Sequence, residues 1–174
     1  QFEVRCGRAV IHPDFVMGRD PLLVAEAIAR AKRQGVSEEL LSELDGFTGA
    51  VGIWDSGRPG PVTAFRFDID CVQVGETSDP AHEANAGGYA SQRPNLMHAC
   101  GHDGHLAVGL GVAQWIKDHA DQLCGKIKLV FQPAEEGTRG AQPMAESGIL
   151  DDVDFIVCTH IGSSVPLHQV AVCT

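Results

Sequence analysis

The spacing of apolar and polar positions predicts two helices near the N-terminus of this chain. Asp20 and Pro21 precede an apolar-rich segment over 22–30, and Gly35 follows its basic last turn. This arrangement supplies the N-cap, the first-turn proline and the C-terminal glycine of a helix. A shorter helix is predicted over 38–44, because a serine directly before it can cap its start.

Four apolar segments are typical of strands, and they lie at 50–54, 62–67, 126–132 and 153–159. The first two are separated by a turn rich in glycine and proline, and Pro133 prevents the third from continuing. Helices are expected over 104–118 and again from near Thr138. Strands that alternate with helices indicate an α/β fold, which we expect to be a three-layer α/β/α sandwich around a mostly parallel mixed sheet.

Two segments between these strands bear on a possible site. In the helix over 104–118, the residues that recur at helical spacing are Leu106, Leu110, Ala113 and Ile116. The segment over 73–95 has few apolar anchors, so a surface loop that sits over a pocket is predicted there.

Composition narrows the class of partner. With 174 residues and 44% hydrophobic content, the chain is long enough for one domain. A net charge of −10 disfavours nucleic acid and anionic membranes as partners and favours a small molecule. No apolar run approaches the roughly 18 residues that span a bilayer, so we expect a soluble protein. The six cysteines accompany no apolar signal segment, which indicates reduced thiols in a cytoplasm.

Cys100 and His102 form the first candidate for chemistry. In an extended segment, residues two apart point to one face, and Gly101 allows close approach of the backbone. Thiolate and imidazole both bind zinc and comparable divalent metals. For the cysteine alone, a buried thiol beside a surface histidine is an equally open interpretation.

Two further candidates follow strands. The adjacent carboxylates Glu135 and Glu136 repel one another unless a cation or different environments separate their roles, so one can bind metal while the other handles protons. A solvated loop pair is the open alternative. His160 ends a predicted strand, where ligands gather in α/β sheets, although a histidine at such a position is more often structural.

All five candidate side chains border strands or helices of one predicted sheet, where they could converge. Together they supply the ligands and the base that a hydrolytic metal centre requires. Asp68 and Asp70 are a second acidic pair, able either to orient a ligand histidine or to cap a loop. The remaining polar residues of the motif are interpreted as supporting partners or as part of the turn into the helix, and none is assigned as a ligand: His98, Asp103 and His105.

The segments over 97–105 and 131–141 resemble those of the metal-dependent amidohydrolases and peptidases that include indole-acetyl-amino-acid, hippurate and p-aminobenzoyl-glutamate hydrolases. They read Met-His-Ala-Cys-Gly-His-Asp-Gly-His and Phe-Gln-Pro-Ala-Glu-Glu-Gly-Thr-Arg-Gly-Ala. Shorter matches lie at 46–49, 57–62 and 160–162, so the resemblance covers the chain from about Gly46 onward. The first 45 residues match loosely.

The resemblance implies two divalent metal ions, with manganese or zinc expected. Cys100 falls at the position that bridges them, and His102, Glu136 and His160 fall at the other ligand positions. Glu135 falls at the catalytic position. The implied reaction is hydrolysis of a small N-acyl amino acid with an aromatic acyl group, p-aminobenzoyl-glutamate first among them, as in folate catabolism.

The chain also departs from this family. Members continue, after a strand like 169–173, into a satellite dimerisation domain and then return to the catalytic domain with one more ligand histidine. Residues 1–174 are therefore expected to be a partial catalytic domain that lacks both and holds most of an active site, which leaves the activity of the truncated chain open. The full-length parent is expected to be dimeric, and one form of that dimer would include a homologous second subunit. The open alternative is a non-catalytic metal-binding fragment or a degenerate remnant.

Overall fold

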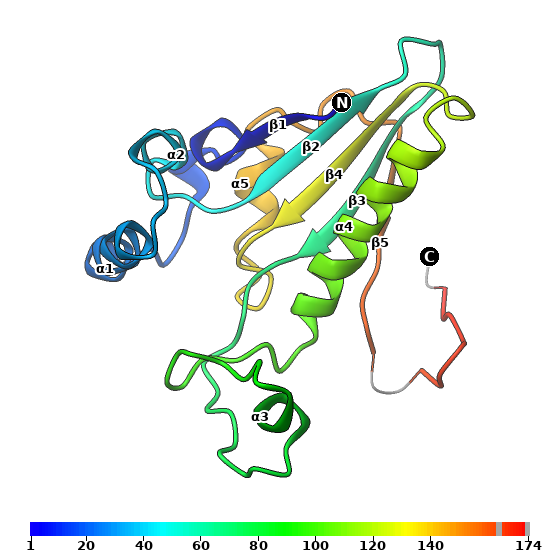
Figure 1. The fold of residues 1–174 in the computed structure, drawn as a ribbon. Helices are drawn as coiled ribbons and strands as arrows, with labels where there is room; N and C mark the ends of the chain where they lie inside the picture. The colour runs from blue at the N-terminus through cyan, green and yellow to red at the C-terminus, as the bar shows by residue number, and fades with distance from the viewer. Residues whose placement is uncertain (163–164, 173–174) are drawn as a thin grey trace.

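A computed structural model describes residues 1–162 and 165–172, and its described residues form a five-stranded mixed sheet (Figure 1). The strand order is β1-β2-β4-β3-β5. β4 pairs in parallel with β3, and β3 with β5, whereas β2 runs antiparallel to both β1 and β4. Their bounds are β1 Glu3–Cys6, β2 Ala50–Asp55, β3 Val62–Asp68, β4 Lys126–Gln132 and β5 Phe155–Cys158.

The helices follow the local signals of the sequence. The Asp20 side chain accepts a hydrogen bond from the Leu22 N–H at the start of α1, and Ser37 accepts one from Leu40 at the start of α2. Both predicted N-caps are therefore confirmed. The bounds are α1 Pro21–Arg33, α2 Glu38–Leu44, α3 Glu83–Gly87, α4 His102–Asp118 and α5 Ala141–Ala145, with short 3₁₀ turns at Gly7–Ala9 and Pro13–Phe15.

The sheet is covered on both faces, as expected for a three-layer sandwich. On one face Ile116 of α4 packs with Phe67, Leu129 and neighbouring apolar side chains, and on the other Met144 of α5 packs with Val130 and its neighbours. α4 joins β3 to β4 in one direction across the sheet, and α5 joins β4 to β5 in the opposite direction. Because such crossovers are right-handed, opposite directions place the two helices on opposite faces.

Not every strand followed its sequence pattern. β2, β3 and β4 agree with the prediction to within one residue, but β5 spans 155–158 rather than 153–159. β1 was not predicted, because four residues that alternate between charged and apolar side chains carry too short a pattern. No strand forms over 169–172, since no described strand pairs with it, and residue 173 of that expected strand lies outside the described residues.

α4 forms where it was predicted, but only part of its apolar pattern faces the sheet. Ile116 is buried and Ala113 packs against the core, whereas Leu106 and Leu110 are exposed; His105 and Gly109 are buried as well. A Cβ at Gly109 would lie 2.6 Å from Phe131 Cε1, so the helix packs on the sheet at a residue without a side chain. The hydrophobic pattern could not show this, because the closest contact is made by backbone.

Two other segments differ in detail from expectation. The helix expected from near Thr138 starts at Ala141, after the turn that carries the glutamate pair. The segment over 73–95 is mostly loop, with the one-turn helix α3 inside it, and extends beyond the sheet (Figure 1). Its ends and α1 border an open cleft of about 670 Å³.

Among the described residues, no helix is both long and apolar enough to cross a membrane. Cys6, Cys71, Cys100, Cys124 and Cys158 are free thiols.

We expect Gly109→Ala to destabilise the fold by about 1–3 kcal/mol, because the added methyl must displace the aromatic rings beneath α4. Gly111→Ala on the same helix is the matched control, since its Cβ would meet nothing within 4 Å. The control should be neutral or stabilise by up to about 1 kcal/mol through helix propensity. Urea unfolding of both variants measures the difference, and equal free energies of unfolding would contradict the packing described.

Candidate metal centre

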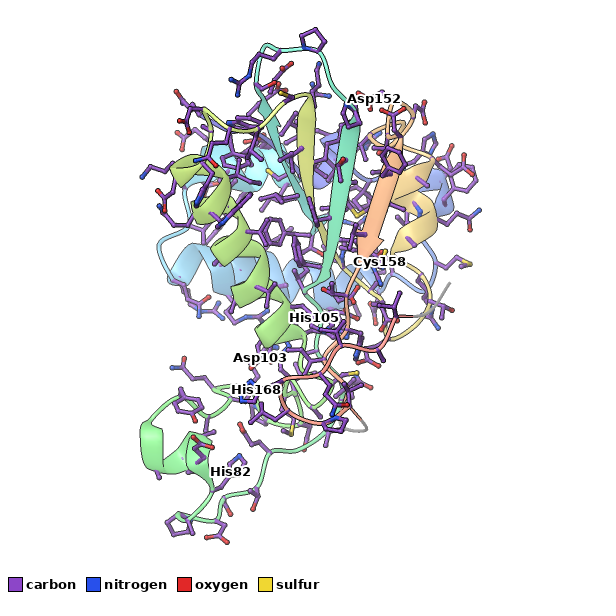
Figure 2. The ribbon with its side chains drawn as sticks, turned by 90° about the vertical axis from the view of Figure 1, so that its right-hand side faces the viewer. His82, Asp103, His105, Asp152, Cys158 and His168 are labelled. Carbon is purple, nitrogen blue, oxygen red and sulfur yellow. The ribbon has the colours of Figure 1, made fainter. Side chains whose placement is uncertain are left out.

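The candidate site lies at the carboxyl ends of the three parallel strands, beside the N-terminus of α4. Residues that follow β3, β4 and β5 meet there, because strands paired in parallel end at the same edge. In Figure 2, His105 marks this edge near the start of α4, whereas Asp152 lies at the opposite end of the sheet. His82 lies farther away, in the α3 segment, where it pairs with Glu76 at 3.2 Å.

Cys100 and His102 reach the site by a different backbone path from the one predicted. They are not in an extended segment: Gly101 is the N-cap of α4 in the left-handed region, with φ at 80°, and His102 is the first helical residue. A glycine is favoured at such a φ because it has no Cβ to clash. The sharp change of direction sends thiol and imidazole into one group with His160.

His102 is the most constrained member of the site. Its ring is fully buried, and its Nδ1 lies 3.0 Å from the Asp70 carbonyl oxygen and 3.1 Å from Asp70 Oδ1. These acceptors require Nδ1 to carry the hydrogen, which leaves the lone pair on Nε2. That Nε2 is buried and has no hydrogen-bond partner. The orienting role expected for Asp70 thus has the required geometry.

The two glutamates approach His102 from the turn after β4. Ala134 and Thr138 adopt left-handed conformations, with φ at 55° and 53°, and fold the chain back toward α4. Glu135 Oε2 and Glu136 Oε1 lie 3.7 and 3.8 Å from His102 Nε2. The Glu136 backbone N–H also donates to Asp70 Oδ2 at 3.0 Å, so this turn is tied to the end of β3.

Cys100 and His160 complete the group. Cys100 Sγ lies 3.6 Å from His160 Nε2, and the two come from segments 60 residues apart. A hydrogen bond to Glu136, together with partial burial and the nearby carboxylates, raises the pKa of the Cys100 thiol. In this set of residues only a cation would reverse the effect and favour the thiolate.

The side chains fit a divalent metal by their chemistry. Cys100, His102 and His160 offer ligand atoms within 4.8 Å of one another, and so do His102, Glu135 and Glu136. Among residues 1–162 and 165–172, every such group includes His102. The buried His102 Nε2 is an acceptor that faces carboxylates and a thiol and has no hydrogen-bond donor as a partner. A metal ion would bind its lone pair and so satisfy it.

A third group, formed by Asp68, His102 and His105, is a poorer metal site. The Arg66 guanidinium pairs with Asp68 and places a positive charge inside this group. His105 Nδ1 faces Asp68 Oδ2 at 3.3 Å, although the pair does not meet hydrogen-bond geometry. Burial, and then the neighbouring histidines, lower the pKa of His105, so its ring is held neutral.

The structure brings together all five candidate residues and adds a sixth that the sequence pattern undervalued. Cys100, His102, Glu135, Glu136 and His160 converge, whereas His98 and Asp103 are exposed and contribute to none of these groups. His105 is fully buried beside them. The sequence could have indicated His105 through its position, because a residue three places after His102 lies on the same face of a helix.

The fold and the site together define a class: an α/β protein with a metal-binding group at the carboxyl ends of its parallel strands. Residues 64–174 match the model of peptidase family M20/M25/M40. This match covers more than half of the sequence, and the chain belongs to that family.

Individual relatives agree with the family match. A Haemophilus influenzae protein, named as a homolog of one p-aminobenzoyl-glutamate hydrolase subunit, is 52% identical over 92% of this chain and 38% of its own length. The crystal structure of an aminobenzoyl-glutamate utilization protein from Klebsiella pneumoniae has a TM-score of 0.73 at 41% identity, covering 95% of this chain and 36% of that one.

The Bacillus subtilis YXEP protein, a dinuclear metal binding peptidase from the M20 family, has a TM-score of 0.62 at 28% identity, covering 90% of this chain and 41% of that one. The chain thus spans about two fifths of the length of the relatives it matches.

We expect Glu136→Gln to speed alkylation of Cys100 in the metal-free chain at pH 8. Removing the carboxylate that raises the thiol pKa lowers that pKa, so a larger fraction is thiolate at the same pH. Peptide mass spectrometry after iodoacetamide pulses would separate Cys100 from the exposed thiols of Cys71 and Cys124. Glu83→Gln is the matched control, and an equal rate in both variants would contradict this prediction.

Proposed function

We propose that this chain provides most of a dinuclear metal centre of an amidohydrolase, as a partial catalytic domain over residues 1–174. The observation that carries the proposal is the buried Nε2 of His102, which has no hydrogen-bond partner and faces two carboxylates. Cys100, His102, Glu136 and His160 are the residues that would hold the metal ions. Manganese and zinc both suit this mixture of thiolate, imidazole and carboxylate.

Two contacts support different roles for the adjacent glutamates. Glu136 hydrogen-bonds the Cys100 thiol, and its own backbone N–H is held by Asp70, so it belongs with the ligands. The Glu135 side chain has no such contacts, although it is as exposed as that of Glu136, at 32% against 30%. A carboxylate near the centre without a fixed partner suits a proton carrier.

The proposed reaction is amide hydrolysis. Divalent ions at this centre would polarise the scissile carbonyl and lower the pKa of bound water towards about 7. Glu135 takes a proton from the attacking water and then delivers it to the leaving amine. Asp70 keeps the His102 ring in one tautomer throughout, with Nε2 directed at the centre.

The proposed substrate is p-aminobenzoyl-glutamate, cleaved to p-aminobenzoate and glutamate by a parent protein of the relatives' length. The names of the Haemophilus and Klebsiella relatives support this choice of acyl group and amino acid. The name of the Haemophilus relative refers to one subunit of a hydrolase, which supports a second, homologous subunit for the parent, and a dimer is proposed.

Substitution of the two glutamates tests the assignment. Glu136→Gln should weaken manganese binding by the chain by at least tenfold, because a charged ligand is lost, and Glu135→Gln should leave binding within about threefold. In the parent protein, Glu135→Gln should slow p-aminobenzoate release by about a hundredfold or more, as expected for loss of a general base. Calorimetry and absorbance assays measure the two effects, and full hydrolysis by Glu135→Gln would refute the mechanism.

An unmodified chain that binds no manganese or zinc would overturn the metal centre itself. If the chain binds metal but the parent cleaves no N-acyl amino acid, a non-catalytic metal-binding role replaces the proposed one.

Asp70→Ala should weaken metal binding by roughly ten- to hundredfold, because the His102 ring loses the acceptor that fixes its tautomer. Asp79→Ala, in the α3 segment, is the matched control and should bind metal as the unmodified chain does. Equilibrium dialysis with manganese gives both affinities. If Asp70→Ala retained full affinity, Asp70 would have no part in orienting the ligand.

A further inference from the structure

His160 belongs to a segment with few supports of its own. β5, which precedes it, has exposed side chains throughout, and residues 159–162 have no regular secondary structure. A ligand carried on such a segment needs another element to hold it, because loose placement of a ligand weakens a metal site.

The Ile161 peptide group fixes the orientation of the His160 ring. The Ile161 carbonyl oxygen lies 2.8 Å from His160 Nδ1 and accepts its hydrogen, which leaves the lone pair of Nε2 directed at Cys100. The Ile161 N–H, on the same residue, donates to His105 Nε2 at 2.9 Å. Ile161 therefore ties the backbone of this segment to α4, next to the edge-on contacts that the His160 ring makes with His102 and His105.

The side chain of Ile161 rests in a gap left by glycines at the start of α4. A Cβ on Gly104 would lie 2.5 Å from Ile161 Cδ1, and one on Gly101 would lie 3.6 Å from Ile161 Cβ. Gly101 is also required by its left-handed backbone, but Gly104 is an ordinary helical residue. Since glycine weakens a helix, the close approach of Ile161 gives a reason for Gly104.

His105 in turn lies against Asp68, at the end of β3. Its Nε2 accepts the Ile161 N–H, so its hydrogen lies on Nδ1, which faces Asp68 Oδ2 at 3.3 Å. Asp68 is fully buried and paired with Arg66. The chain of contacts thus runs from β3 through His105 to the segment that carries His160.

We propose that Gly104 and His105 are positioning residues that lock Ile161 against α4 and so place His160 at the metal centre. This role in metal binding rests on the function proposed above. The lock itself is a feature of the fold and can be measured without metal.

The decisive variant is Gly104→Ala, with Gly111→Ala as its matched control on the same helix. Gly104→Ala should push the flexible end of the half-exposed Ile161 side chain away from α4, and so speed hydrogen exchange of the Ile161 amide and weaken manganese binding measurably. Gly111→Ala should change neither, because its Cβ meets nothing within 4 Å. Exchange measured by NMR and affinity measured by calorimetry give the two readouts on the full 174-residue chain.

A second pair of variants separates positioning from general loss of structure. His105→Phe fills the same space without an acceptor and should speed Ile161 exchange, whereas His105→Gln places an oxygen near the position of Nε2 and should restore protection. The rescue should extend to metal affinity.

The outcomes distinguish the two proposals. If the unmodified chain binds no metal, the proposed function fails. Hydrogen exchange of the Ile161 amide still tests whether Gly104 and His105 hold Ile161 against α4. If the unmodified chain binds metal and Gly104→Ala matches it in both affinity and Ile161 exchange, the positioning role is overturned. Equal exchange in His105→Phe and His105→Gln would also overturn it.

Discussion

The hydrogen bond between Asp70 and the buried His102 ring is the interaction on which the rest of the site depends. Asp70 accepts from His102 with one carboxylate oxygen and from the Glu136 backbone N–H with the other. One side chain thus joins the end of β3, the start of α4 and the turn after β4. Because His102 is fully buried and Nε2 lacks a partner, this arrangement places an unsatisfied acceptor nitrogen among acidic groups.

The sheet topology makes that convergence possible. Crossovers in opposite directions from the central strands put α4 and α5 on opposite faces, and the carboxyl ends of β3, β4 and β5 remain together at one edge. The close packing of α4 at Gly109 sets the height of the helix above the sheet, and its N-terminus then brings His102 and the preceding Cys100 to that edge. The same helix, α4, therefore contributes both to the stability of the fold and to the geometry of the site.

Much of the fold was predictable, because its signals are local. Caps at Asp20 and Ser37 and the apolar run of β4 each involve residues that are neighbours in sequence. The errors have a common physical cause. β1 and the buried face of α4 are defined by what they pack against. The apolar period predicted the helix, but Leu106 and Leu110 of that period are exposed, while Gly109 and His105 are buried.

The sequence by itself determined which chemical groups are available: a thiol, imidazoles and paired carboxylates, each next to a turn or a strand end. Residue type and local backbone preference can be read directly from the sequence, so Cys100 and the Glu135-Glu136 pair could be identified as candidate site residues without a structure. Only the tertiary structure decided which imidazoles are buried, which nitrogen each presents, and that His105 accepts the Ile161 N–H. Burial and hydrogen-bond direction at the site depend on segments as much as 66 residues apart, and no local pattern encodes them.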